Sequence, residues 1–325
     1  MEYVTLGRTG LKVSVAGLGC GGFSRLGLGT GKSEADAVAL VRQALEMGVN
    51  LLDTAAVYGT EAVIGKAIAD VPRDGVVLAT KAWIPGRTGR SASDRAIASL
   101  DNSLRQLGTD YVDLFQLHGV SPRGYDQALE VIAPALQKEQ EKGKIRHLGV
   151  TEAGSGDPEH AMVRRAVEDG VWDVVMVAFH MMHQNARSLV FPHTLAHRVG
   201  TLAMFAVRNI FSKPQRLAAA LRELTARGEL PRWLAVAPNP LGFLLHPDGG
   251  ASSITEAAYR FVRHEPGVDV VLFGTGDPEH LRANIAALLA PPLPLADRQT
   301  LTKLFGRLSG VGLDPPDSMP GFSSA

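Results

Sequence analysis

The sequence predicts a single-domain α/β protein, residues 1–325, folded as a closed (β/α)8 barrel of the TIM type. Short apolar runs of strand length alternate with longer segments whose apolar residues recur at helical spacing, almost from end to end. Eight such units can be read. They span about 250 residues, the usual size of a closed barrel, and closure leaves no exposed strand edge. An open doubly wound sheet is the alternative arrangement of the same units.

Each predicted strand is a short apolar run, and a predicted helix follows it. The strands are expected at residues 13–18, 50–53, 76–80, 112–117, 145–150, 174–179, 201–206 and 268–273. The helices are expected at residues 33–47, 61–69, 93–107, 125–142, 158–168, 186–198, 253–263 and 278–289. Residues 33–47 are typical, because Ser33 can cap the first turn, apolar side chains share one face, and Gly48 can end the helix.

Three segments fall outside this repeat. Residues 3–6 and 11–13 flank the turn sequence GRTG, which predicts an N-terminal β-hairpin that could plug one barrel end. The period fails from residue 211 to residue 250, where prolines and glycines accumulate. We interpret this segment as a long insertion after the seventh strand that could fold over a site at the barrel mouth. The chain end is rich in Pro, Gly and Ser, and residues 309–325 are expected to form a disordered tail.

The composition argues against several classes of function. Lys plus Arg equals Asp plus Glu at 33 each, so we expect no nucleic-acid partner and favour a small-molecule ligand. The single cysteine, Cys20, cannot form an internal disulfide, which suits a reducing compartment. No signal-peptide pattern occurs at the N-terminus, and no run approaches roughly 20 apolar residues. We therefore expect a cytoplasmic protein without a membrane partner; the sequence leaves its oligomeric state open.

Four polar residues stand at or just beyond the ends of successive predicted strands. Asp53 ends the second strand, Tyr58 lies in the loop after it, Lys81 follows the third strand, and His118 follows the fourth. In a barrel of this kind the active site lies at the carboxyl ends of the strands. A charged residue directly after an apolar strand must be paired or leave the core, because an isolated buried charge is costly. Lys81 paired with Asp53 meets that requirement.

These side chains suit proton transfer to a carbonyl oxygen. An ammonium near a phenol favours the phenolate, so we expect Lys81 to lower the pKa of Tyr58 from its usual value of about 10. Asp53 would hold Lys81 charged, and His118 could orient the carbonyl. Hydride chemistry would then require a bound cofactor. Taken singly, each residue also has a structural explanation, as a helix cap, a packed aromatic, a surface lysine or a core histidine.

The residues around this group resemble the aldo-keto reductase family. The matching stretches are 48–65 (GVNLLDTAAVYGTEAVIG), 80–81 (TK), 108–118 (GTDYVDLFQLH) and 143–150 (GKIRHLGV), and the first motif is long and specific. The resemblance covers roughly residues 1–290 and implies a barrel that binds an extended NADP(H) across the strand ends. It implies that Asp53, Tyr58, Lys81 and His118 form the catalytic tetrad. Asp53 would also contact the cofactor and His118 the substrate.

The resemblance also assigns contacts at the nicotinamide end of the cofactor. Thr151 and Glu152 take the places of a Ser-Asn pair that holds the carboxamide, although an ionised Glu152 cannot donate. Met176 replaces a glutamine, so another amide contact is lost. Phe205 replaces the tyrosine on which the nicotinamide stacks and keeps the aromatic face. Arg208 stands where the cofactor-covering loop begins.

Residues 274–284 resemble the family segment at the adenosine end. Gly274 and His280 take the places of a lysine and an arginine that often grip the 2′-phosphate, and Asp277 adds an unfavourable negative charge. Thr275 and the helix start after it can still receive a phosphate, and Asn284 matches the asparagine that contacts adenine. We expect NADP(H) as the cofactor, with NAD(H) as the alternative.

Loop residues near the tetrad are candidates for the remaining contacts. Gly21 and Gly22 end the first strand, where glycines let the backbone approach the cofactor. Phe23, Val57 and Trp83 could line the substrate pocket, although Phe23 and Trp83 are equally explicable as core aromatics. Histidine pairs elsewhere in the chain lack a carboxylate motif beside them, so no metal is expected.

The sequence therefore predicts an NAD(P)(H)-dependent oxidoreductase that interconverts an alcohol and an aldehyde, ketone or sugar carbonyl. Tyr58 would act as general acid in reduction and general base in oxidation, while the nicotinamide carries the hydride. The alternative is a non-catalytic, nicotinamide-sensing binding protein on the same barrel, which the departures at Thr151, Glu152 and Met176 keep open. The sequence does not identify the substrate, because the loops that line the binding pocket are the variable part of a barrel.

Overall fold

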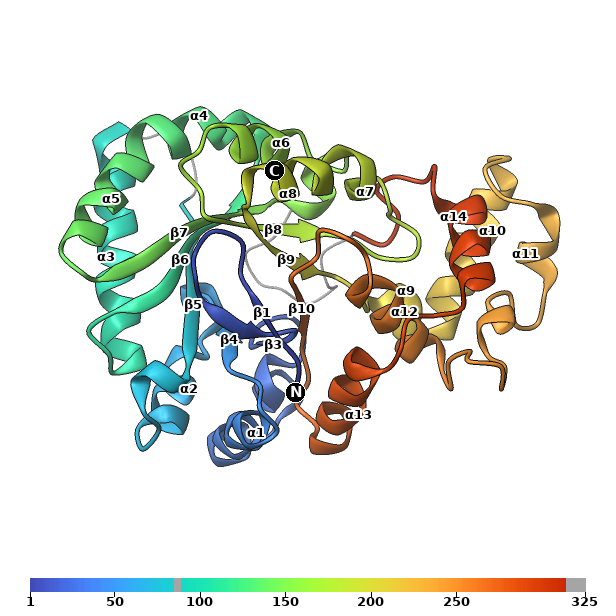
Figure 1. Cartoon of the computed structure of the whole chain (residues 1–325), viewed down its shortest axis with the longest axis horizontal. Coiled ribbons are helices and arrows are strands. Elements are labelled where there is room, and N and C mark those ends of the chain that lie inside the picture. Colours follow the sequence, from blue (N-terminus) through green and yellow to red (C-terminus); the bar gives the residue numbers. More distant parts are fainter. Residues whose placement is uncertain (85–88, 314–325) are drawn as a thin grey trace.

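The computed structural model describes residues 1–84 and 89–313, and its centre is a closed barrel of eight parallel strands (Figure 1). The strands pair in the order β10-β3-β4-β5-β6-β7-β8-β9, and β10 closes the barrel between β9 and β3. Their bounds are β3 Ala16–Gly19, β4 Leu51–Asp53, β5 Val77–Ala82, β6 Val112–Val120, β7 Ile145–Glu152, β8 Val174–Ala178, β9 Gly200–Met204 and β10 Val270–Phe273. The predicted (β/α)8 fold is confirmed, and the open-sheet alternative is excluded.

The start of the first predicted barrel strand is wrong. Residues 13 and 14 belong to β2 (Lys12–Ser14), which pairs antiparallel with β1 (Tyr3–Thr5), and β3 begins only at Ala16. Ser14 marks the change of direction. Its backbone N–H donates to Asn50 Oδ1 at 2.7 Å, and its hydroxyl donates to the carbonyl of Ala16 at 2.7 Å. The apolar run conceals this break, because the hairpin and the barrel both bury its side chains.

The hairpin of β1 and β2 plugs the amino-terminal end of the barrel, as predicted. Leu6 and Val13 are buried in one cluster with interior side chains near the strand starts, including Leu51, Val77, Val174 and Val270. The turn fits closely against the barrel. Gly7 has φ +48°, and a Cβ on it would lie 2.1 Å from the backbone nitrogen of Gly200. A ligand site must therefore form at the opposite, carboxyl end.

Helices form the outer layer around the barrel (Figure 1). The α-helices are α1 Glu34–Glu46, α2 Glu61–Ile68, α3 Gly89–Leu107, α4 Tyr125–Gln127, α5 Ala133–Glu141, α6 Ala161–Glu168, α7 Ala186–Leu189, α8 Phe191–His197, α9 Asn209–Ser212, α10 Pro214–Ala226, α11 Arg232–Val236, α12 Ile254–Arg263, α13 Pro278–Leu289 and α14 Leu295–Phe305. The 3₁₀ segments are Arg25–Thr30, Ala56–Tyr58, Arg73–Gly75, Pro122–Gly124, Gly154–Gly156 and Gly242–Leu244, and Ala128–Ile132 is a π-helical turn between α4 and α5. Within the described ranges, none of the helices has both the length and the apolar character needed to cross a bilayer.

Local sequence signals explain where two predicted helices begin or break. At the start of α1, Ser33 Oγ accepts from Asp36 N at 3.2 Å and the Asp36 carboxylate accepts from Ser33 N at 3.0 Å, a reciprocal cap. The helix predicted at 186–198 is divided at Val190 into α7 and α8. The second of these starts next to Pro192, which has no N–H to continue the hydrogen bonds of the first.

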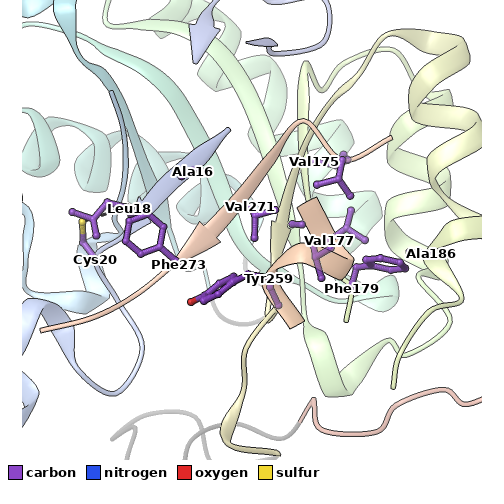
Figure 2. Packing of buried hydrophobic residues seen from close by; sticks show 14 of the residues in the cluster. Ala16, Leu18, Cys20, Val175, Val177, Phe179, Ala186, Tyr259, Val271 and Phe273 are labelled. Carbon is purple, nitrogen blue, oxygen red and sulfur yellow. Dashed lines mark hydrogen bonds between the residues drawn. The ribbon is translucent and has the colours of Figure 1, made fainter. Parts of the chain in front are cut away.

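Strand side chains alternate between the barrel interior and the helical layer. On β8, Val174 and Met176 belong to the interior cluster, whereas Val175 and Val177 pack in the outer cluster. Figure 2 shows this outer cluster, in which side chains of β3, β8 and β10 gather with Tyr259 of α12. The alternation places Met176 inside the barrel.

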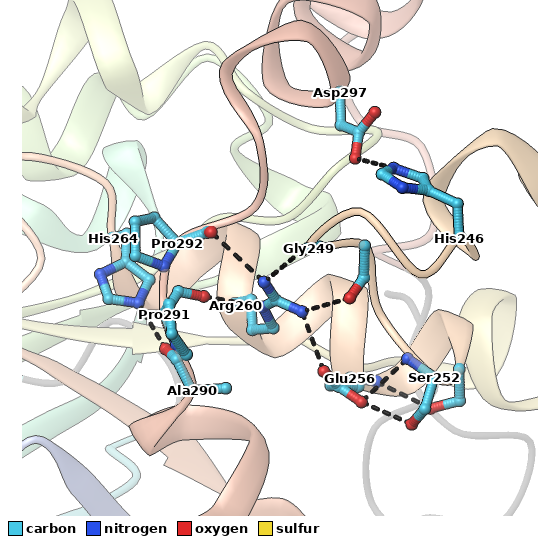
Figure 3. Close-up of polar contacts among 12 residues, drawn as sticks. His246, Gly249, Ser252, Glu256, Arg260, His264, Ala290, Pro291, Pro292 and Asp297 are labelled. Atoms are coloured by element: carbon cyan, nitrogen blue, oxygen red, sulfur yellow. Dashed lines mark hydrogen bonds and ion pairs between the residues drawn. The ribbon is translucent and has the colours of Figure 1, made fainter.

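The long insertion after β9 is present and packs at one side of the molecule, next to α14 (Figure 1). Arg260 of α12 anchors its end, because the guanidinium donates to the carbonyls of Gly249 and Gly250 at 2.8 and 2.9 Å (Figure 3). His246 Nε2 lies 2.9 Å from Asp297 Oδ2 of α14. In Figure 1, α10 and α11 lie well apart from β4, β5 and β6. The insertion thus does not cover the ends of those strands in this structure.

The last described residues pack against the barrel. Ser309 Oγ donates to the Glu159 carboxylate at 2.6 Å and lies 3.1 Å from the carbonyl oxygen of Pro158, and Leu313 is buried. The expected tail from residue 309 therefore starts too early: residues 309–313 are part of the packed structure. Residues 314–325 lie outside the described part of the chain.

Candidate active site

The carboxyl ends of β4 and β5 bring Asp53 and Lys81 together. Lys81 Nζ donates to Asp53 Oδ2 at 2.7 Å and to the carbonyl of Thr54 at 2.8 Å, while Gln116 Nε2 donates to Asp53 Oδ1 at 3.3 Å. Lys81 is fully buried and Asp53 is 4% exposed. Strand register accounts for the meeting, because Asp53 pairs with Ala79, two residues before Lys81 on β5, and Lys81 pairs with Gln116 of β6. These contacts exclude a surface lysine and a helix-capping aspartate, and they add Gln116, which sequence reasoning missed.

Tyr58 completes the group from the 3₁₀ turn Ala56–Tyr58. Its hydroxyl lies 3.2 Å from His118 Nε2, and the two rings meet edge to face with centroids 5.5 Å apart. Lys81 Nζ lies 5.2 Å from the centroid of the Tyr58 ring. Gly21 makes room for this ring, because a Cβ on Gly21 would lie 2.4 Å from Tyr58 Cε2. The structure therefore brings the four expected residues together, and the close neighbour of Gly21 is the tyrosine ring.

Burial dominates the proton affinities in this group. Burial raises the pKa of Tyr58 above its usual value and outweighs the opposite effect of Lys81, so the expected lowering is wrong. The phenol stays protonated at neutral pH. Burial, together with the charge of Lys81, lowers the pKa of His118 to about 3, so its imidazole is neutral. Burial alone would lower the pKa of Lys81, but the carboxylate of Asp53 and then Tyr58 raise it, so the ammonium stays charged.

Three apolar side chains beside the group face solvent. Phe23, Val57 and Trp83 are 59%, 48% and 41% exposed. Val57 precedes Tyr58, and Trp83 follows Lys81 by two residues, so both belong to the barrel mouth. The core explanation of Phe23 and Trp83 is therefore wrong. Exposed apolar side chains at a barrel mouth are typical of a ligand-binding surface.

Glu152 at the end of β7 is bonded within the protein. Its Oε1 accepts from the N–H of Ala178 at 2.6 Å, and its Oε2 lies 2.8 Å from His160 Nδ1. His160 Nε2 in turn lies 3.0 Å from Asn185 Oδ1. Both Glu152 and His160 are buried. The carboxylate that the resemblance places at the carboxamide thus already has two partners, and His160 is a residue that sequence reasoning missed.

The surroundings of His160 form a buried polar cluster at the ends of β7 and β8. The His160 and His183 ring centroids are 5.0 Å apart, and His183 Nδ1 accepts from the N–H of Gly310 at 3.1 Å. Thr151 is also engaged, since its Oγ1 accepts from the N–H of Gly119 at 2.7 Å. In the described ranges, no three His, Cys, Asp or Glu side chains come together as a group that could hold a metal. The cluster instead connects the chain end to the barrel.

Phe205 and Arg208 form a stacked pair at the end of β9. The guanidinium carbon of Arg208 lies 4.0 Å from the centroid of the Phe205 ring, and Arg208 Nη2 donates to the carbonyl of Leu313 at 3.5 Å. Phe205 has φ +71°, a strained conformation for an aromatic residue, and such strain concentrates at ligand sites. Met176, buried in the barrel interior, adds no polar contact. Phe205 therefore places an aromatic ring just beyond the carboxyl end of β9, with Arg208 over one face of it.

The adenosine-end candidates lie in the loop after β10 and in the first two turns of α13. Gly274 and His280 are exposed, whereas Thr275 and Asn284 are buried. Asp277 is the N-terminal cap of α13. The segment that the resemblance assigns to adenosine thus lies at a helix start beyond the eighth barrel strand, a position at which barrels often bind phosphate.

The fold and this group of side chains define a (β/α)8-barrel protein with a cluster of ionisable side chains at the carboxyl ends of its strands. The aldo/keto reductase family model matches residues 17–304, and the chain belongs to this family. It is 30% identical over 322 residues to L-galactose dehydrogenase of Arabidopsis thaliana, covering 96% of this chain and 95% of that one. It is 29% identical over 299 residues to aldo-keto reductase YhdN of Bacillus subtilis (strain 168), covering 87% of each.

A solved structure gives the same assignment. The holo form of aldo-keto reductase AKR11C1 from Bacillus halodurans matches with a TM-score of 0.69 and 25% identity, over 94% of this chain and 96% of that chain. The family resemblance predicted from the sequence is therefore confirmed. Membership supports NAD(P)-dependent carbonyl reduction as the general class of activity.

Proposed function

We propose that this protein catalyses reduction of an aldehyde or ketone by a nicotinamide cofactor, or the reverse oxidation of a sugar-like hydroxyl, with Tyr58 as the general acid and base. The observation that carries the proposal is the 3.2 Å approach of the Tyr58 hydroxyl to His118 Nε2 beside the buried Lys81–Asp53 pair. When bound, the cofactor supplies the hydride. The chain's own residues supply the proton and the charge stabilisation.

Each member of the group has a distinct task in reduction. A substrate carbonyl oxygen placed within hydrogen-bond distance of both Tyr58 Oη and His118 Nε2 can accept one hydrogen bond from each. His118 is neutral, so it orients this oxygen without adding a net charge. Tyr58 gives its proton to the oxygen as the alcohol forms. The buried ammonium of Lys81 then stabilises the phenolate, and Asp53 holds that ammonium in place.

The residues present fit a nicotinamide dinucleotide at one end of the site. The ring of Phe205 would stack on the nicotinamide, and the hydroxyl hydrogen of Thr151 can still be donated to a carboxamide. Phe23, Val57 and Trp83 would form apolar walls for the substrate. Glu152 does not fit the carboxamide, because both of its oxygens are engaged.

The test is Tyr58→Phe, with Tyr259→Phe as the matched control. Tyr259 is a buried tyrosine of α12 in the outer core and takes no part in the acid–base group. Tyr58→Phe is expected to lower kcat on a good carbonyl substrate by about 10²–10⁴-fold while cofactor binding persists. Unchanged kcat would remove Tyr58 from the mechanism. Tight cofactor binding without turnover of any member of a carbonyl and sugar panel by the unmodified protein would favour the nicotinamide-sensing alternative.

A further inference from the structure

The start of α13 carries a carboxylate where a phosphate would otherwise bind. Asp277 Oδ1 accepts from the N–H groups of Glu279 at 2.8 Å and His280 at 3.2 Å. Free N–H groups of this kind make a helix start a site for phosphate. Here a side chain of the same negative charge occupies two of them.

The hydroxyl beside this cap is also engaged. Thr275 Oγ1 accepts from the N–H of Asp277 at 3.0 Å and lies 3.3 Å from the carbonyl of the same residue. The two bonds to backbone N–H groups lower the pKa of Asp277, so its carboxylate is ionised at neutral pH. A phosphate approaching this loop would meet a negative charge together with a hydroxyl that already has partners.

The nearby cations do not offset this charge. Lys32 Nζ lies 3.8 Å from Asp277 Oδ2, so the nearest ammonium is paired with the carboxylate itself. Arg282 on α13 faces the amide of Gln43 on α1. With this amide oriented so that its oxygen faces the guanidinium, the oxygen accepts from Arg282 Nη2 at 2.8 Å and from Nε at 3.3 Å. The pair of Lys32 and Asp277 has no net charge, whereas a phosphate site needs an excess of positive charge.

Close packing fixes the position of Lys32. A Cβ on Gly276 would lie 2.4 Å from the backbone nitrogen of Gly27, so the loop before α13 and the 3₁₀ segment Arg25–Thr30 are in direct contact. Lys32 follows that segment and is brought to the helix start by it. The two packed loops thus bring Lys32 next to the helix start, where its partly exposed side chain reaches Asp277.

We propose that this site selects NAD(H), whose adenosine ribose carries a free 2′-hydroxyl, and that Asp277 is the residue that excludes the 2′-phosphate of NADP(H). A carboxylate repels a phosphate but accepts a hydrogen bond from a ribose hydroxyl. The inference rests on the proposed function for the presence of a nicotinamide cofactor. It replaces the NADP(H) expected from the family resemblance.

The experiment measures binding to the full chain by calorimetry, without turnover. The ligands are ADP-ribose and 2′-phospho-ADP-ribose, which differ only in the phosphate, followed by NADH and NADPH. The unmodified protein is expected to bind ADP-ribose at least tenfold more tightly than its 2′-phosphorylated form, a difference of about 1.4 kcal/mol. Asp277→Asn keeps a helix-capping side chain and removes the charge. It is expected to tighten binding of the 2′-phosphorylated ligand by about tenfold.

Two further variants make the result specific. Lys32→Ala added to Asp277→Asn should reverse the gain, because the freed ammonium is the cation that would grip the phosphate. Asp126→Asn removes a comparable exposed carboxylate, paired with Arg165 at 2.8 Å, and should leave both ligands unaffected. Equal or tighter binding of the 2′-phosphorylated ligand by the unmodified protein, or an unchanged ratio in Asp277→Asn, would overturn the inference and leave the proposed function standing. Failure of all four ligands to bind would overturn both.

Discussion

Asp53→Asn is expected to destabilise the protein through Lys81, without a large change in volume. Lys81 is fully buried, and its ammonium has the Asp53 carboxylate at 2.7 Å and the carbonyl of Thr54 at 2.8 Å as acceptors. An asparagine keeps a hydrogen-bonding oxygen at the position but removes the compensating charge. The ammonium is then a buried charge with neutral partners only, an arrangement that proteins avoid.

The magnitude follows from the depth of burial. Removing one partner of a buried ion pair costs about 3–5 kcal/mol, because the remaining charge keeps its desolvation penalty. Replacing both partners by uncharged groups of similar size costs far less. We therefore expect Asp53→Asn to lower the free energy of unfolding by about 3–5 kcal/mol at pH 7, and the double variant Asp53→Asn/Lys81→Met to recover most of that loss.

As the pH rises above neutral, the free energy of unfolding is expected to fall in the unmodified protein and to increase in Asp53→Asn. In the unmodified protein burial acts to lower the pKa of Lys81, but Asp53 and Tyr58 raise it overall. Burial raises the pKa of Asp53, so the charged pair is lost at low pH when this carboxylate is protonated. Above that range the stability from the charged pair is complete up to the unfolded-state pKa of Lys81, about 10.4, and it is lost as the pH rises through the folded-state value. In Asp53→Asn burial is no longer opposed by the carboxylate, so the folded-state pKa of Lys81 falls. That variant should gain stability as the pH rises from about 7 towards 10.

Urea unfolding followed by circular dichroism measures both effects, with Asp70→Asn as the control. Asp70 forms a surface pair with Arg42 at 3.5 Å and is 89% exposed, so its loss should not be measurable. Equal destabilisation by Asp53→Asn and Asp70→Asn would refute the reasoning. So would a double variant no more stable than Asp53→Asn, because the damage would then not come from an uncompensated charge.

Three further predictions concern the surroundings of this pair. Gly21→Ala should lower kcat about tenfold or more, because the new Cβ would displace the Tyr58 ring. The control is Gly75→Ala, whose Cβ would meet nothing within 4 Å and should leave kcat unchanged. Equal losses in the two variants would contradict a role for the close approach of Gly21 to Tyr58. The kcat for reduction should be flat from about pH 5 to pH 9, since His118 is neutral above about 3 and burial keeps Tyr58 protonated; a titration near pH 7 would refute this. Glu152→Gln should reduce the unfolding free energy by about 1–3 kcal/mol, because it disturbs the buried bonds of Glu152, and it should leave the Kd of the cofactor unchanged. A higher Kd with unaltered stability would instead make Glu152 a cofactor contact.

The meeting of the four polar residues could be predicted from the sequence because strand geometry determines it. Parallel strands in a closed barrel bring their carboxyl ends to one face. Residues placed at successive strand ends, such as Asp53 and Lys81, must therefore become neighbours. Gln116 was missed because it lies within an apolar strand, where only the barrel register reveals that it points to Asp53.

Two properties could not be predicted in the same way: how deeply a side chain is buried, and in which direction it points. The pKa of Tyr58 moves up because burial outweighs Lys81, and the sequence contains no measure of burial at a loop residue. Glu152 turns to His160, which has a left-handed backbone (φ 54°) before α6 and belongs to no periodic pattern. A usable signal did exist, since a carboxylate that ends an apolar strand requires a partner, as Asp53 does.

Two carboxylates in the candidate cofactor site share one feature: backbone N–H groups hold each of them. Glu152 accepts from Ala178, and Asp277 accepts from Glu279 and His280. Turning the buried Glu152 towards a ligand would leave an N–H unpaired, which costs about 1–3 kcal/mol. The proposed dinucleotide site would leave these bonds intact, with the Phe205 ring against the nicotinamide and the Asp277 carboxylate beside an adenosine ribose without a 2′-phosphate. The buried pair of Lys81 and Asp53 is separate from both Glu152 and Asp277. Of these two departures from the family pattern, only the carboxylate of Asp277 bears on the cofactor choice that we propose, whereas Glu152 keeps its bonds within the protein.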